Sequence, residues 1–186
     1  MATTQSELAQ TPQAVMEFWK QAGPKQWFAK DQAFDRLFGD TFHTAHFQAA
    51  RRELEHWMAE PQGALALLIL LDQYPRNTFR GTAHMFATDP LARFYARQMI
   101  DAGLDRQVDA SLRAFCYLPF EHSEDAADQR LSLTLHQDFE PEDFKWAKEH
   151  ADIIERFGRF PHRNHVLGRS TTEQERVFLE SGGFAG

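Results

Sequence analysis

The longest apolar run of the chain, residues 64–71, lies between Pro61 and Pro75. It is too short to cross a bilayer. Because it is apolar on every side, periodicity alone does not separate a buried helix from a buried strand. Its Ala and Leu content and its lack of Val favour a helix. We therefore expect a central buried helix that begins at Pro61 and ends at Pro75.

The rest of the chain also has helical spacing, and it contains no alternating segment rich in Val, Ile and Thr. Thr11 with Pro12 is typical of a helix start, and Gly23 with Pro24 of a helix end. These patterns predict an all-α fold of antiparallel helix pairs. Further helices are expected from Asp31 to Gly39, over residues 41–59, and after Asp89 as far as Gly103. Others are expected around residues 108–115, after a Ser123 cap with Ala127, Leu131 and Leu135 inward, and from Pro141 to about residue 156. The last helix is expected over residues 172–180, behind a Thr171-x-x-Gln174 capping box.

Length and composition predict one domain over residues 1–186, with flexible ends at 1–10 and 182–186. The apolar fraction of 42% and the charged fraction of 25% are those of an ordinary soluble protein. The N-terminus has no signal-peptide pattern, so we expect a cytoplasmic protein that does not enter a membrane. Cys116 is the single cysteine, which excludes an internal disulfide, and the net charge of -7 argues against a nucleic-acid partner.

The basic stretch, residues 156–169, most strongly indicates a charged site. It holds four arginines and two histidines and no acid, a charge of +4 over 14 residues. Such a cluster needs negative charge nearby, which either the protein's own carboxylates or an external anion can supply. Because guanidinium groups bind carboxylate and phosphate with two hydrogen bonds, an anion site is the sharper hypothesis. The basic residues are Arg156, Arg159, His162, Arg163, His165 and Arg169.

Two further stretches place polar residues beside apolar ones. The motif at residues 70–81 carries Asp72, Gln73, Arg76, Asn77 and Arg80 at the end of the central helix. These residues predict either an ion-pair network at the helix end or part of a binding site.

The motif at residues 117–124 carries Glu121, His122 and Glu124 just before a helix. Two carboxylates beside an imidazole suit acid–base work. A helix cap at Ser123 with Glu124 in the first turn is the simpler interpretation.

Metal and nucleotide motifs are absent from the sequence. His43 with His46, and His162 with His165, are spaced three apart, but neither pair belongs to a known metal motif. There is no phosphate-binding loop, no G-x-G-x-x-G and no G-x-S-x-G. We therefore expect no metal and no cofactor.

Three motifs in this order, L-D-Q-Y-P-R-N-T-F-R-G, Y-L-P-F-E-H-S-E and R-F-G-R-F-P-H-R-N, resemble the bacterial family called domain of unknown function 924. The likeness runs from about Val15 to Phe184, with Tyr74 at a position where Phe is also expected. The resemblance implies a tetratricopeptide-like fold of packed helix pairs. It implies no settled activity.

The resemblance also suggests that the three motifs converge on one pocket. Asp72, Glu121 and Glu124 would balance its positive charge, and His122 and His162 would transfer protons, with Glu121 as the orienting group. This pocket would bind a small anionic molecule, with or without catalysis. The alternative is an interaction module whose groove holds an acidic peptide. The oligomeric state is left open. The ligand-binding candidates are Asp72, Arg76, Asn77, Arg80, Glu124, Arg159, Arg163, Asn164 and Arg169.

Overall fold

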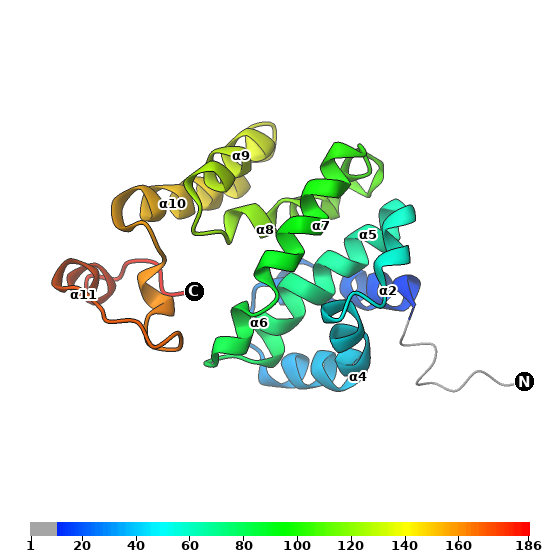
Figure 1. Cartoon of the computed structure of the whole chain (residues 1–186), viewed down its shortest axis with the longest axis horizontal. Helices are drawn as coiled ribbons and strands as arrows, with labels where there is room; N and C mark the ends of the chain where they lie inside the picture. Colours follow the sequence, from blue (N-terminus) through cyan, green and yellow to red (C-terminus); the bar gives the residue numbers. More distant parts are fainter. Residues whose placement is uncertain (1–10) are drawn as a thin grey trace, which may run out of the picture. The chain divides into compact units, whose positions relative to one another are not determined.

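The computed structural model describes residues 11–186, with only the backbone at residues 142 and 143 (Figure 1). This part of the chain is helical or irregular and contains no strand, which confirms the all-α prediction. It divides into two compact units. The first comprises residues 11–80 and 84–119, and the second residues 81–83 and 120–186. No helix within residues 11–186 is both long and apolar enough to span a membrane.

The first unit is built on α5 (Pro61–Leu68), which continues through the π-helical turn η2 (Ile69–Gln73) into α6 (Tyr74–Thr78). Residues 64–71 are at most 1% exposed. α5 contacts α2 (Pro12–Ala22) and α7 (Asp89–Asp101). The prediction of a central buried helix is confirmed, but its predicted end at Pro75 is wrong because α6 continues past that residue.

The wide turn of η2 explains how the helix passes Pro75. Proline has no N–H, so it leaves a carbonyl of the preceding turn without its helical donor. Side chains from other elements supply donors to two successive carbonyls: His46 Nδ1 lies 2.9 Å from Leu70 O, and the Thr88 hydroxyl donates to Leu71 O at 2.5 Å. These bonds satisfy the helix backbone inside an apolar core.

α4 (Gln32–Ala50) replaces the two helices expected at residues 31–39 and 41–59. Asp31 caps it as expected, but the helix does not stop at Gly39 and instead bends at Phe42, where φ is -114° and ψ is 16°. Gly39 is needed for packing rather than for termination, because an added Cβ would lie 3.0 Å from Thr78 Cγ2. The expected helix at 41–59 is also wrong: α4 ends at Ala50, and a separate 3-10 turn, η1 (Glu55–Ala59), follows.

Shorter elements complete the first unit around an aromatic core. α7 begins at Asp89, with Thr88 before its first turn, so the helix starts one residue earlier than expected. The segment expected to be helical around residues 108–115 is a 3-10 helix, η5 (Ala110–Cys116). The remaining short elements are α3 (Pro24–Trp27), η3 (Ala83–Phe86), η4 (Asp105–Gln107) and α8 (Leu118–Glu121), of which η3 and α8 lie where the two units divide.

The second unit contains α9 (Ala126–His136) packed against α10 (Pro141–Phe157), followed by η6 (Pro161–Arg163) and α11 (Glu173–Glu180) (Figure 1). α10 ends at Gly158, whose φ of +67° suits glycine. Asp125, and not Ser123, caps α9. Likewise, the capping box of α11 pairs Thr172 with Glu175, one residue later than predicted.

The apolar core of the second unit consists of Ile153, Ile154 and Phe160, with Phe157, Phe178 and Phe184 packed against it. Phe184 belongs to the C-terminal segment for which flexibility is predicted. Its ring lies 4.5 Å from the ring of His150 and 5.2 Å from that of His162. This segment therefore contributes a side chain to the unit's core, and its mobility stays a prediction, as does the flexibility of residues 1–10, which lie outside the described residues.

Candidate acid–base site

A carboxylate and two imidazoles meet in the second unit. Glu121 is 4% exposed, and its Oε1 lies 3.3 Å from His150 Nδ1 while its Oε2 lies 3.8 Å from His136 Nε2. His150 Nδ1 lies 2.9 Å from Trp146 O, one turn earlier in its own helix. Because a carbonyl only accepts, Nδ1 of His150 carries the hydrogen, and Nε2 of the neutral ring is an acceptor.

His150 is held in its neutral form. Burial and the neighbouring His122 lower its pKa to about 3, and Arg163 and His162 contribute in the same direction, whereas the bond to Trp146 O opposes the shift. A neutral imidazole with a fixed tautomer is a proton acceptor rather than a charge. The structure thus surrounds one uncharged histidine with several cationic or potentially cationic groups.

The predicted residues His122, His162 and Arg163 lie around this histidine. The rings of His122 and His150 are 6.2 Å apart. Arg163 is buried, its Nη2 donates to His122 O at 2.9 Å, and its guanidinium lies 4.4 Å from the Phe160 ring centre. His162 packs against the same Phe160 ring at 5.7 Å. The second and third sequence motifs are therefore brought together here.

Two other arginines of the basic stretch pair with carboxylates of the same unit. Arg169 donates to both oxygens of Glu124 at 2.8 Å, and Glu124 Oε1 also accepts from the backbone N–H of Phe160 at 2.9 Å. Burial alone would raise the pKa of Glu124, but these hydrogen bonds and the charge of Arg163 hold it below its usual value. Arg169 and Glu124 therefore tie the loop to the segment before α9.

Arg159 forms a similar double contact with Glu175, through Nε at 2.6 Å and Nη2 at 2.9 Å. The Arg159 hydrogen bond, assisted by bonds from Thr172, lowers the pKa of Glu175 to about 2 against the opposing effect of burial. Asn164 is fully buried and donates to the same carboxylate at 3.3 Å. The interpretation of internal ties thus fits Arg159, Asn164 and Arg169.

Residues 70–80 of the first motif lie in the first unit and form a compact ion-pair network. Arg76 donates to both oxygens of Asp89 at 2.8 and 3.0 Å, and its Nη1 also lies 3.2 Å from Asp72 Oδ1. Asp72 accepts a further bond from the Gln73 amide at 2.6 Å. This guanidinium lies between two buried carboxylates, as expected for a helix-end network.

Asn77 and Arg80 share a different carboxylate. Asn77 Nδ2 donates to Asp35 Oδ1 at 2.7 Å, and Arg80 donates to both Asp35 oxygens at 2.6 and 3.1 Å. The three residues line an open, polar pocket of about 620 Å³ on α4 and α6. The convergence of this motif with the other two on one pocket stays a prediction.

No group of three or more His, Cys, Asp or Glu side chains is placed to hold a metal ion in the part of the chain that the structure describes. The expectation that the protein uses neither a metal nor a cofactor stays a prediction.

A family model described as "Bacterial protein of unknown function (DUF924)" matches residues 15–183. The chain belongs to this family. A solved structure, titled as that of the protein of unknown function ATU0120 from Agrobacterium tumefaciens, is similar to this DUF924 chain with 54% sequence identity and a TM-score of 0.91. The match covers 94% of this chain and 99% of that one. No curated protein matches. The family resemblance is thus confirmed, and the descriptions of the family and of the solved structure name no activity.

Sequence reasoning missed several residues of this DUF924 chain. In α9 the apolar pattern favoured Ala127, Leu131 and Leu135 as the inward face, but the buried residues are Gln129, Ser132 and His136. The prediction is wrong because this face meets polar groups: the Gln129 amide donates to Glu121 O at 2.7 Å and to Ser123 O at 2.6 Å.

His150 carried a signal that was overlooked, since it lies three residues after Ala147 and four before Ile154, on the buried face of α10. The carboxylate partners Asp35, Asp89 and Glu175 gave no such signal, because each is remote in sequence from the arginine that it binds.

Proposed function

We propose that this protein is a cytoplasmic protein that binds a small anionic molecule at His122, His162 and Arg163 and can transfer a proton there. Arg163 supplies permanent positive charge, His122 and His162 supply donors of adjustable protonation, and Glu121 orients the imidazoles around it. The observation that carries this proposal is the gathering of these groups around the neutral His150.

The groups around His150 support the proposal, although burial is the main cause of its lowered pKa. Its pKa is lowered partly by three positive or potentially positive neighbours, so an anion placed among them would be attracted. The ion pairs of Arg159 with Glu175 and of Arg169 with Glu124 fix the conformation of the loop. We therefore assign binding to Arg163 and the two histidines and a supporting role to Glu124, Arg159, Asn164 and Arg169. For Asp72, Arg76, Asn77 and Arg80 we propose a supporting role in the first unit.

A thermal-shift screen of phosphates, nucleotides and small carboxylates tests the proposal on wild type, Arg163→Lys and His162→Gln. A ligand at about 100 times its dissociation constant adds roughly 2.7 kcal/mol, which raises the melting temperature by about 5–10 °C for a chain of this size. The same shift should shrink in both variants and persist in Arg130→Gln, which changes an exposed arginine on α9. A shift that is equal in all four proteins would place the ligand elsewhere and contradict the proposal.

The alternative is that the chain is a tetratricopeptide-like superhelical module that binds an acidic peptide. The packing of α9 with α10 as a helix pair favours it, since such pairs are the repeating unit of that fold. The same variants separate the two functions. A peptide spread over a helix groove would bind through many residues, so the loss of Arg163 or His162 alone would weaken it little.

A further inference from the structure

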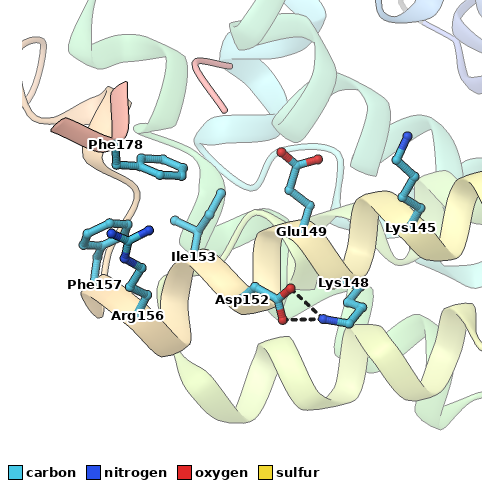
Figure 2. Close-up of a pocket in the computed structure, with 8 residues that line it drawn as sticks. All are labelled: Lys145, Lys148, Glu149, Asp152, Ile153, Arg156, Phe157 and Phe178. Carbon is cyan, nitrogen blue, oxygen red and sulfur yellow. Dashed lines mark hydrogen bonds and ion pairs between the residues drawn. The ribbon is translucent and has the colours of Figure 1, made fainter. Parts of the chain in front are cut away.

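A second hollow lies along α10, where Phe178 of α11 approaches this helix (Figure 2). Its volume is about 350 Å³. Ile153, Phe157 and Phe178 give it an apolar wall, and charged residues of α10 line the rest. A volume of this order suits a small molecule.

Arg156, unlike Arg159 and Arg169, lies against aromatic rings. Its guanidinium carbon lies 4.6 Å from the ring centre of Phe157 and 5.6 Å from that of Phe178. Within the described residues, no carboxylate lies within ion-pair distance of Arg156, whereas Arg159 and Arg169 each bind one. Stacking on aromatic rings orients the guanidinium and leaves its N–H edge able to donate.

The other charges of the groove do not neutralise Arg156. Lys148 Nζ donates to both oxygens of Asp152 at 2.7 and 2.6 Å, so that acid is already bound. Glu149 lies two helical turns before Arg156, about 10 Å along the helix axis. Figure 2 shows Glu149 toward the end of the groove that holds Lys145, while Arg156 lies beside the two phenylalanines. The end of the groove at Arg156 therefore combines positive charge with an apolar wall.

We propose that this groove binds a small monocarboxylate that carries an aromatic ring. The carboxylate accepts hydrogen bonds from the Arg156 guanidinium, and the ring packs on Ile153, Phe157 and Phe178. None of Glu121, His122, His150, His162 and Arg163 lines this groove, and the proposal does not rest on the function proposed for those residues. The same chemistry occurs in a free aromatic acid and at the end of a peptide chain whose last residue is aromatic. We assign the groove to the free acid because of its small volume.

Isothermal titration of the full chain with phenylacetate tests this proposal. Acetate has the carboxylate without the ring, and phenylacetamide has the ring without the charge. Saturable binding is expected for phenylacetate alone. Arg156→Gln should weaken it by at least about ten-fold, since a charged hydrogen-bond pair is lost. Arg176→Gln on α11 changes an exposed arginine outside the groove and should leave the affinity unchanged.

Four outcomes would overturn the groove site. Phenylacetate that does not bind removes it, as does phenylacetamide that binds equally well. An unchanged affinity in Arg156→Gln together with a loss in Arg163→Lys would move the ligand to the His150 cluster, which supports the function proposed there and contradicts the groove. A peptide ending in phenylalanine that binds with its free carboxylate, but not as its amide, while phenylacetate fails would mean a protein partner instead of a small molecule.

Discussion

The arginines of two sequence motifs lie in different surroundings. At residues 70–80, in the first unit, Arg76 and Arg80 each donate to both oxygens of a carboxylate, Asp89 and Asp35 respectively. At residues 156–169, in the second unit, Arg159 and Arg169 do the same with Glu175 and Glu124. Arg163 instead binds a backbone carbonyl and a ring, and Arg156 lies over rings.

The difference shows why charge density alone does not identify a binding site. An arginine with a bidentate carboxylate has its charge matched inside the fold, so it stabilises structure and offers little to a ligand. An arginine that rests on carbonyls or rings keeps its net charge. Mutations should therefore act on stability at the arginines that bind a carboxylate with two hydrogen bonds, such as Arg76 and Arg159, and on binding at Arg156.

The largest effect is expected for Arg76→Met. The substitution leaves Asp72 and Asp89 buried without their shared cation, so we expect unfolding in urea to show a loss of about 3–5 kcal/mol. Arg51→Met breaks an exposed pair with Glu53 and should cost less than about 1 kcal/mol. Similar losses in the two variants would mean that the buried network contributes no more than a surface pair, and the contrast between the segments would fail.

The next largest effect is expected for His150→Asn, which should change how the free energy of unfolding falls in acid. The asparagine amide can still donate to Trp146 O but does not titrate. The pKa of His150 is about 3 in the fold and near 6.5 in an unfolded chain, so below pH 6.5 the unfolded state binds the extra proton. Wild type should then lose stability between pH 6.5 and 3 by about 1.4 kcal/mol per pH unit more than the variant.

Urea unfolding at several pH values measures this difference. His46, whose pKa burial lowers to about 4, titrates in both proteins and cancels in the comparison. His56→Asn, an exposed site in the first unit, should follow wild type. Parallel pH profiles for wild type and His150→Asn would show that His150 is not held neutral, and would remove the support that it gives to an anion site.

The fold could be predicted from sequence where local signals act alone. Proline and glycine mark the ends of α2 and α10, and the apolar run marks α5. Prediction failed where tertiary contacts override those signals. Gly39 suggests a helix end, but in the fold it leaves space for the Thr78 side chain. Pro75 also suggests a helix end, but the side chains of His46 and Thr88 form hydrogen bonds with the carbonyls of the preceding turn. Nothing local to either residue encodes these partners.

The candidate site could be predicted only in part, because its tertiary partners are also not encoded locally. Unusual local composition points to Glu121, His122, His162 and Arg163 from the sequence alone. Composition did not indicate which charges are already matched, because Glu124 precedes Arg169 by 45 residues and Glu175 follows Arg159 by 16. His136 was hidden by the polar inward face of α9, where the hydrophobic pattern points to the wrong side.

Within the basic stretch, Arg159→Gln should have an intermediate effect. The change leaves the Glu175 carboxylate, which is 2% exposed, without its bidentate partner, so we expect a loss of about 2 kcal/mol in urea unfolding. The loss should also shrink with acid. Because the pKa of Glu175 is lowered to about 2, its pairing stabilises the fold above about pH 5 and is lost as the pH falls toward 2. A loss that is independent of pH would mean that Arg159 acts through packing.

The smallest effect on stability is expected for Arg156→Gln, the matched counterpart of Arg159→Gln three residues earlier on the same stretch. The substitution removes a guanidinium that lies over two rings on the surface, for which the contribution is about 0.5–1 kcal/mol. No buried carboxylate loses a partner, so unfolding in urea should hardly change between pH 8 and pH 4. A loss as large as that of Arg159→Gln would show that Arg156 is a structural tie and not a free cation. A small loss combined with weakened carboxylate binding would show that Arg159 stabilises the fold while Arg156, at the end of α10, contacts a ligand.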